Sequence, residues 1–243
     1  MTKYGLIGKE IDYSFSRGYF AEKFTREQLA NNQYDNYDCT TIDDLKQTLA
    51  QKDIAGLNVT IPYKETVLPM MDSLSEQARE IGAVNTIIFK ENGHLEGHNT
   101  DAYGFEKALF GRFDITPKKA LILGTGGASK AIEFVLKKRG IQPQFVSRKR
   151  TAKALPYSAL TPEIIQSHLL IINCTPLGTF PKVDEAPEIA YTAITHQHVL
   201  FDLIYNPEKT RFMQLGEKQG ARVANGHQML IHQAERSWAL WNP

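Results

Sequence analysis

The fold is decided by Ala120-Leu121-Ile122-Leu123-Gly124-Thr125-Gly126-Gly127-Ala128-Ser129. The apolar run is typical of a buried parallel strand, and the small residues after it are typical of a tight turn that opens a helix. In a dinucleotide-binding turn, Gly124 makes the turn, Gly126 admits a pyrophosphate, and Ser129 takes the place of a small packing residue. The helix start then offers free N–H groups to the phosphates. Because glycine-rich turns also occur for structural reasons alone, the rest of the chain has to decide between the two interpretations.

The end of the next expected strand bears on which dinucleotide would bind. A site for NAD places Asp or Glu there, about 20 residues after the glycines, to hold the ribose 2′-hydroxyl. This chain has Ser147-Arg148-Lys149-Arg150 at that place. Arg148 can stack on an adenine and bind a phosphate with its planar fork, so the segment favours NADP. The alternative is a solvated basic loop.

The bulk composition is that of an ordinary globular protein. The chain has 243 residues, 42% of them hydrophobic and 23% charged, with a net charge of +1. A core in one or two domains is therefore expected, and no nucleic-acid partner is indicated. Cys39 and Cys174 lie far apart without metal-ligand or redox spacing, which favours a reduced, cytoplasmic protein. The apolar run near Met1 is too short for a signal peptide and no stretch is long enough to span a bilayer, so we expect neither, and no membrane partner.

Strand and helix patterns alternate along both halves of the chain, which predicts an α/β fold. We expect strands at residues 4–8, 37–42 and 56–61, a hairpin turn at Asn92-Gly93, and a helix over residues 228–241. The glycine-rich turn opens a second series of strands and helices. This layout predicts an N-terminal α/β domain of residues 1–101 and 226–243. It also predicts a Rossmann-like domain of residues 102–225, with the C-terminal helix returning to the first domain.

Polar residues stand at several expected strand and helix ends. Ser14 and Ser16 precede a helix and could cradle a carboxylate, although a helix cap is the plainer interpretation of the two serines alone. Lys64 follows a short strand, where a lysine is ordinarily just exposed. Asn85-Thr86 and Asn99-Thr100-Asp101 would each be interpreted alone as cap or turn residues.

Taken together, these segments form an ordered set that covers almost the whole chain. The set is Gly5-Leu6-Ile7-Gly8 with Ser14-x-Ser16, Asn58-Val59-Thr60-x-Pro62-x-Lys64, Gly82-Ala83-Val84-Asn85-Thr86, Asn99-Thr100-Asp101-x-x-Gly104-Phe105, Gly124-x-Gly126-Gly127-Ala128-Ser129, Asn173-x-Thr175-Pro176-x-Gly178, Asp202-Leu203-Ile204-Tyr205-Asn206-Pro207-x-x-Thr210, and Asn225-Gly226-x-x-Met229-Leu230-x-x-Gln233-Ala234. In these segments and in their order, the chain resembles the shikimate dehydrogenase family.

The resemblance implies reversible, NADP-dependent reduction of 3-dehydroshikimate to shikimate, a step of the shikimate pathway of aromatic amino-acid (chorismate) biosynthesis. It implies an N-terminal substrate-binding and catalytic domain and a Rossmann-like NADP-binding domain. Lys64 and Asp101 would be the catalytic pair, with Lys64 giving the proton and Asp101 orienting it. No metal would be needed.

The resemblance also assigns the remaining site residues. The substrate-binding residues would be Ser14, Ser16, Thr60, Asn85, Asp101, Tyr205 and Gln233. The cofactor-binding residues would be Gly124, Gly126, Gly127, Ala128, Ser147, Arg148, Lys149, Thr175, Gly226 and Met229. The partners would be a small-molecule substrate and NADP, in a monomer or a homodimer.

The chain departs from the family pattern at a few positions. Arg17 stands where the family usually has Pro, Phe20-Ala21 replaces a His-Asn pair, and the family's Asn-Arg-Thr phosphate motif matches only at Arg148. One alternative is a quinate/shikimate dehydrogenase of relaxed substrate and cofactor use. Ser16 favours shikimate, because quinate-active relatives often carry Thr at this place. The other alternative is an inactive NADPH-binding sensor, which would be expected to lack Lys64 or Asp101.

Overall fold

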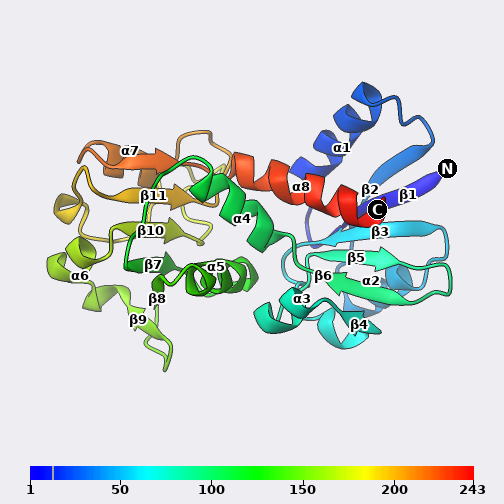
Figure 1. The fold of residues 1–243 in the computed structure, drawn as a ribbon, viewed down its shortest axis with the longest axis horizontal. Coiled ribbons are helices and arrows are strands. Elements are labelled where there is room, and N and C mark those ends of the chain that lie inside the picture. Colours follow the sequence, from blue (N-terminus) through cyan, green and yellow to red (C-terminus); the bar gives the residue numbers. More distant parts are fainter. Residues whose placement is uncertain (13) are drawn as a thin grey trace. The chain divides into compact units, whose positions relative to one another are not determined.

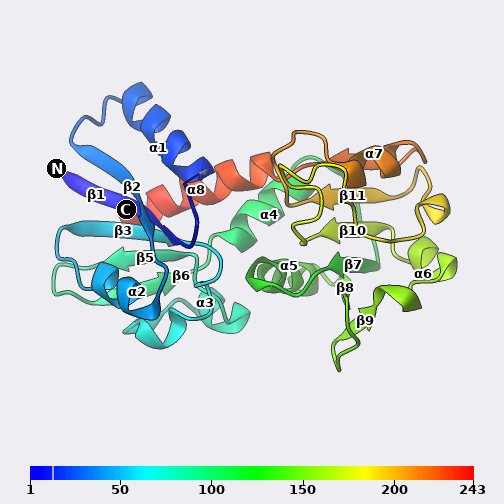
Figure 2. The ribbon, with the colours of Figure 1, turned by 180° about the vertical axis from the view of Figure 1, so that it is seen from behind.

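The computed structural model describes residues 1–12 and 14–243 and divides the chain into two compact units, each with its own sheet (Figures 1 and 2). Unit 1 contains Met1–Tyr103 and Leu230–Pro243, and unit 2 contains Gly104–Met229. The chain leaves unit 1 within helix α4 (Asp101–Phe110) and returns to it within helix α8 (His227–Trp241). Unit 1 is therefore assembled from two separate stretches of sequence.

Unit 1 is built on a six-stranded mixed sheet in the order β2-β1-β3-β5-β6-β4. Its parallel part joins β1 to β2 and β3, and its antiparallel part joins β5 to β3 and β6. Before α4 the elements are β1 (Thr2–Gly8), α1 (Phe15–Arg26), β2 (Asn32–Asp38), α2 (Ile42–Leu49), β3 (Ile54–Val59), a 3₁₀ turn (Leu68–Met70), β4 (Ser73–Leu74), α3 (Glu76–Ile81), β5 (Thr86–Phe89) and β6 (Leu95–His98). The hairpin expected at Asn92-Gly93 joins β5 to β6 and is confirmed.

The second strand lies earlier than its sequence pattern indicated. We expected a strand at residues 37–42, whereas β2 covers Asn32–Asp38. Thr41 instead begins α2, because its hydroxyl accepts a hydrogen bond from the Asp44 N–H while the Asp44 carboxylate accepts one from the Thr41 N–H. Among the mostly polar residues of the edge strand β2 only Tyr34 is buried, so no apolar alternation marks this strand.

Helices cover both faces of the unit 1 sheet (Figures 1 and 2). On one face, Phe20 of α1 and Trp241 of α8 pack over Tyr4 of β1. On the other face, α2 and α3 pack on the remaining apolar side chains of the sheet. Gly56 makes room for α8, since a Cβ atom there would lie 2.2 Å from the Trp241 indole nitrogen. That nitrogen donates a 3.0 Å hydrogen bond to the Ile87 carbonyl and so fixes α8 on the sheet.

Unit 2 is built on a parallel six-stranded sheet in the order β12-β11-β10-β7-β8-β9. After α4 its elements are β7 (Lys119–Leu123), α5 (Gly127–Lys138), β8 (Gln142–Ser147), β9 (Ala154–Pro156), a 3₁₀ turn (Tyr157–Ala159), α6 (Pro162–Ser167), β10 (Leu170–Asn173), a 3₁₀ turn (Tyr191–Ala193), β11 (Val199–Asp202), α7 (Arg211–Glu217) and β12 (Arg222–Ala224). With β7 first in the series, this is the strand order 3-2-1-4-5-6 of dinucleotide-binding folds. The predicted Rossmann-like sheet is confirmed.

Residues of β11 alternate between the two faces of this sheet, as expected for a strand covered on both sides. Leu200 packs with Phe212 and Met213 of α7 in one apolar cluster. Its neighbour Phe201 meets Phe105 of α4 edge to face, with ring centroids 5.3 Å apart. Apolar packing on both faces therefore fixes the strands of this sheet, and ligands of such sheets bind at the carboxyl ends of the strands.

Candidate functional site

Lys64 and Asp101 form a largely buried ion pair in unit 1. Lys64 lies in the turns that follow β3, and Asp101 is the first residue of α4. The Lys64 ammonium donates to the Asp101 carboxylate over 2.6 Å, and their side chains are only 13% and 3% exposed. The Lys64 carbonyl accepts a 2.8 Å bond from the Val84 N–H, which fixes the lysine backbone. The structure thus brings together the two residues predicted to form a catalytic pair.

Asn85 and Gln233 meet in the same unit although they are distant in sequence. Asn85 directly precedes β5, Gln233 lies on α8, and the Asn85 amide donates to the Gln233 side-chain oxygen over 3.2 Å. The Asn85 side-chain oxygen accepts a 2.6 Å bond from the Thr100 N–H, next to Asp101. Thr60 directly follows β3 and is tied to β1 by a 2.8 Å bond from its N–H to the Ile7 carbonyl. These predicted substrate residues stand at strand and helix ends.

Ser14 and Ser16 have different surroundings at the start of α1. Ser14 is the N-cap residue of α1, but its side chain makes no capping bond. Its hydroxyl oxygen is buried and has no hydrogen-bond partner among residues 1–12 and 14–243. The helix-cap interpretation is therefore wrong for the Ser14 side chain. Burial raises the pKa of Tyr34 well above its ordinary value, and the side-chain hydrogen bond between Ser16 and Tyr34 offsets only part of that rise.

The glycine-rich turn of unit 2 leaves space at the start of α5. Gly124 has φ +105°, and a Cβ atom there would lie 3.0 Å from the Cys174 carbonyl oxygen, so only glycine fits the turn. A Cβ atom on Gly126, the N-cap of α5, would meet no atom within 4 Å. No side chain in the described part of the chain caps this helix, so the N–H groups of its first turn, at Gly127 and Ala128, can bind an anion. Buried Ser129 packs under the turn and donates a 2.6 Å bond to the Gly126 carbonyl.

The strand end after β8 carries exposed cations. The Ser147 hydroxyl donates to the Lys149 carbonyl and closes a turn around Arg148. Arg148 and Lys149 are exposed, and no ion pair within the described part of the chain includes either residue. Two cations without acidic partners suit a phosphate group better than they suit a ribose hydroxyl. This arrangement fits the 2′-phosphate of NADP.

A buried aspartate connects the loops that carry Thr175 and Tyr205. The Asn173 side-chain oxygen accepts a 2.6 Å bond from the Thr175 hydroxyl, and its amide donates a 3.0 Å bond to Asp202. Asp202 also accepts bonds from the Thr210 hydroxyl at 2.6 Å and from the Ile204 N–H at 3.1 Å. Burial raises the pKa of Asp202 to about 6, although these hydrogen bonds act to lower it. The Asp202 side chain thus ties the end of β10 to the loop after β11.

Gly226 and Met229 follow the last strand of unit 2. A Cβ atom on Gly226 would lie 2.1 Å from the Leu203 carbonyl oxygen, and the Gly226 N–H donates a 3.0 Å bond to the Ile204 carbonyl. Only glycine therefore lets this segment pass so close to the loop after β11. Met229 is buried, in the first turn of α8. Both residues lie just beyond the carboxyl end of β12, and ligands of such sheets bind at the carboxyl ends of the strands.

Sequence reasoning missed a group of buried polar residues behind Asn85. Asn58, Thr86, Thr100 and Ser237 are at most 9% exposed and bond to one another. A signal was present in the sequence, since Asn58 interrupts the apolar strand residues Leu57 and Val59, and Ser237 lies on the buried side of α8. A buried polar residue needs a hydrogen-bond partner, but the pattern does not say which residue supplies it.

A dinucleotide-binding sheet in one unit and a buried Lys–Asp pair in the other are the components of a nucleotide-dependent oxidoreductase. The family model for the shikimate dehydrogenase substrate binding domain matches residues 6–87. The shikimate dehydrogenase (NADP(+)) of Desulforamulus reducens is 35% identical to this chain, in an alignment that covers 98% of this chain and 88% of that protein. The chain belongs to the shikimate dehydrogenase family.

Solved structures of a shikimate 5-dehydrogenase and a quinate dehydrogenase are similar to this chain over nearly its whole length. The shikimate 5-dehydrogenase of Thermus thermophilus, in complex with NADP(H) and shikimate, matches with a TM-score of 0.86 and 30% identity over 100% of this chain and 94% of that one. The quinate dehydrogenase of Corynebacterium glutamicum, in complex with NAD, matches with a TM-score of 0.86 and 26% identity over 99% and 93% of the two chains. In residues 1–12 and 14–243, no helix is long and apolar enough to cross a membrane.

Proposed function

We propose that this protein is an NADP-dependent shikimate dehydrogenase that reversibly reduces 3-dehydroshikimate to shikimate. The observation that carries the proposal is the Lys64–Asp101 pair, with 2.6 Å between ammonium and carboxylate, in a member of this family. A catalytically inactive sensor would have no need to keep a buried charged pair, whose desolvation is costly unless the pair is well bonded. The Lys–Asp pair therefore favours an enzyme over a sensor.

The residues proposed to bind the substrate match its chemistry, a carboxylate and several ring hydroxyls. The buried Ser14 hydroxyl lacks a partner among the described residues and, together with Ser16, suits the carboxylate. The ring oxygens would be bound by Thr60, Asn85, Tyr205 and Gln233, all of which carry hydrogen-bonding side chains. Asp101 would contact the reacting end of the ring beside Lys64.

NADPH supplies the hydride when it is bound. The N–H groups of the first turn of α5, after Gly124 and Gly126, would hold its pyrophosphate, with Gly127 and Ala128 in that turn. Arg148 and Lys149 would hold the 2′-phosphate over the turn that Ser147 closes. Thr175, Gly226 and Met229 would line the nicotinamide half of the site.

The chain's own residues would handle the proton. When a carbonyl carbon accepts a hydride, its oxygen becomes an alkoxide and needs a proton to give the alcohol. The Lys64 ammonium would donate that proton and take it back from the alcohol in the oxidative direction. Asp101 keeps the ammonium oriented through their 2.6 Å bond. Before the hydride moves, the pair therefore contributes a proton donor that is already correctly oriented.

Each of two domains would carry one part of this work, and their proposed boundaries lie close to those of the two units, after Tyr103 and before Leu230. Residues 1–101 and 226–243 would form the substrate-binding and catalytic domain, and residues 102–225 would form the NADP-binding domain. Cys39 and Cys174 are both free thiols, which supports a protein that works in the reducing cytoplasm. A monomer or a homodimer is proposed, to be distinguished by light scattering.

A quinate/shikimate dehydrogenase of relaxed specificity is the second candidate, favoured by the likeness to a quinate dehydrogenase. A spectrophotometric assay would test shikimate and quinate, each with NADP and with NAD. We expect the highest kcat/KM for shikimate with NADP. Comparable values for quinate or for NAD would replace this proposal with the second candidate. NADPH binding without turnover of either substrate would instead indicate the sensor.

A further inference from the structure

A backbone N–H group identifies which end of the Asn85 carboxamide is the oxygen. The Thr100 N–H points at the Asn85 side chain over 2.6 Å, and because an N–H can only donate, the atom it meets is the carboxamide oxygen. That oxygen also accepts from the hydroxyls of Thr86 at 3.1 Å and Thr100 at 3.2 Å. The NH₂ group of Asn85 must therefore face the other way, toward Gln233.

The same reasoning fixes Gln233. The Asn85 NH₂ donates to the Gln233 side chain over 3.2 Å, so the atom that receives this bond is the Gln233 oxygen. Among residues 1–12 and 14–243, no hydrogen bond is found for the Gln233 NH₂ group at the other end of that side chain. Both carboxamides thus present N–H donors, and such a pair recognises oxygen lone pairs of a carboxylate or a hydroxyl.

Asn58 has its orientation fixed by a second backbone group, behind Asn85. Its side chain lies 3.3 Å from the Asn85 carbonyl oxygen, which can only accept, so the Asn58 NH₂ faces this carbonyl. The same NH₂ donates to the hydroxyls of Thr86 at 3.2 Å and Ser237 at 2.9 Å. The Asn58 oxygen on the other side accepts a 2.8 Å bond from the Tyr34 hydroxyl.

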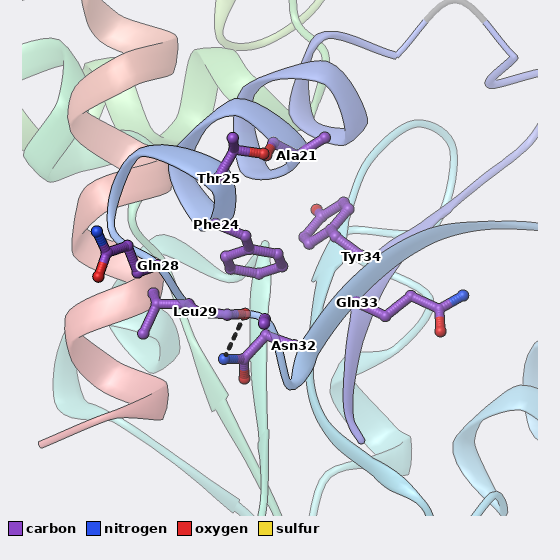
Figure 3. Close-up of a pocket in the computed structure, with 9 residues that line it drawn as sticks. Ala21, Phe24, Thr25, Gln28, Leu29, Asn32, Gln33 and Tyr34 are labelled. Atoms are coloured by element: carbon purple, nitrogen blue, oxygen red, sulfur yellow. Dashed lines mark hydrogen bonds between the residues drawn. The ribbon is translucent and has the colours of Figure 1, made fainter.

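The two hydroxyls pass this direction on to the substrate residues. Thr86 gives its single hydroxyl hydrogen to the Asn85 side-chain oxygen, so the Ser237 hydroxyl, which accepts from Asn58, is the donor in its 2.9 Å bond to Thr86. Gln233 is then oriented through the Asn85 NH₂ group. Thr86 and Ser237 are fully buried, so water cannot replace their bonds. The ring of Tyr34 lines a surface pocket on the α1 and β2 side (Figure 3), while its hydroxyl belongs to this interior chain of bonds.

We propose that Thr86 and Ser237 are positioning residues whose hydroxyls order this buried hydrogen-bond chain so that Asn85 and Gln233 both turn N–H donors toward the substrate's oxygen atoms. The inference rests on the proposed function, because Asn85 and Gln233 contact substrate in that proposal. Without the Thr86 hydroxyl, Asn58 loses an acceptor and the Asn85 oxygen loses a donor. The Asn85 carboxamide is then held less firmly in the orientation that the substrate needs.

Two substitutions of Thr86 separate this positioning role from simple packing. Thr86→Val keeps the side-chain shape and removes the hydroxyl, whereas Thr86→Ser keeps the hydroxyl and removes a methyl group. We expect Thr86→Val to raise the KM for shikimate about tenfold, the effect of one buried hydrogen bond, with little change in kcat or in the KM for NADP. Thr86→Ser should lower the Tm, because the lost methyl group leaves a small cavity, but its KM for shikimate should stay within about twofold of the wild-type value. Ser237→Ala should follow Thr86→Val.

A measurement without substrate makes the inference independent of the proposed function. In ¹⁵N-labelled protein, the side-chain NH₂ hydrogens of Asn85 should exchange with solvent about tenfold faster in Thr86→Val than in the wild type, and at the wild-type rate in Thr86→Ser. Equal exchange in the two variants would overturn the positioning role, as would equal KM values for shikimate. If the wild type does not turn over shikimate, the proposed function fails, while the exchange rates still decide whether the hydroxyl orders Asn85.

Discussion

Asp202→Asn tests the cost of burying a carboxylate in unit 2. Asp202 is fully buried and its pKa is raised to about 6 from an ordinary 3.8. Since one pKa unit corresponds to about 1.4 kcal/mol, the ionised side chain costs roughly 3 kcal/mol of stability at neutral pH. The Asn variant keeps an oxygen for the Asn173 amide and the Ile204 N–H, and the Thr210 hydroxyl can turn to accept from the new NH₂.

The sign of the pH dependence follows from which state holds the proton. Between pH 3.8 and about 6 the folded protein binds a proton at Asp202 that the unfolded chain has released. The stabilisation from Asp202 is therefore fully present below pH 3.8 and is lost as the pH rises through about 6. Part of the loss has already occurred at pH 5, so from pH 5 to pH 8 the wild type should lose about 1.4 kcal/mol relative to Asp202→Asn.

Urea unfolding followed by far-ultraviolet circular dichroism, at half-unit steps from pH 5 to pH 8, measures this difference. Asp114→Asn, at an exposed aspartate of the same unit, is the matched control for removal of a negative charge. A stability difference between wild type and Asp202→Asn that stays flat over this range would refute the reasoning, because Asp202 would then titrate alike in both states. A ¹³C titration of the Asp202 carboxyl group gives the pKa directly.

Substitutions at three further residues test the catalytic pair, the phosphate site and the anchor of α8. Lys64→Ala should lower kcat by about 10²- to 10⁴-fold with little change in the KM for shikimate, and an unchanged kcat would reject Lys64 as the proton donor. Arg148→Ala should raise the KM for NADPH by about 10- to 100-fold and that for NADH far less, with Arg148→Lys in between; equal effects on both cofactors would contradict a phosphate-binding role. Trp241→Phe leaves the Ile87 carbonyl without its 3.0 Å indole bond and should cost about 2 kcal/mol in urea unfolding followed by Trp238 fluorescence. A loss below about 0.5 kcal/mol would show that this bond does not anchor α8.

The unit 2 turn could be predicted because its physical demands are local. A positive φ at Gly124, with a carbonyl oxygen 3.0 Å from the place of a Cβ atom, is a requirement that only glycine meets, so it appears directly in the sequence. The edge strand β2 was placed too late for the opposite reason. Its polar residues have neighbours on one side only, and the alternation that marks a strand is weak there.

The polar chain behind Asn85 was beyond sequence reasoning because its contacts are long-range. Ser237 bonds to Thr86 over 2.9 Å across 151 positions of sequence, and no local spacing encodes that pairing. Asn85-Thr86 alone is indistinguishable from a turn. The Ser14 hydroxyl shows the same limit, since a residue at a helix N-cap has the sequence of a cap whether or not its side chain bonds to the helix.

The return of α8 to unit 1 has a consequence for the order in which the protein is made. In Figure 1 the blue strand β1 and the red helix α8 belong to the same unit. A ribosome therefore completes all of unit 2 before it delivers Trp241, which covers Tyr4 and Phe20 near the start of the chain. Until then those aromatic side chains are without their cover and open to association with other chains. A nascent chain of this protein would need a chaperone most while unit 2 is emerging, and a frameshift near α8 would unfold the part that was made first.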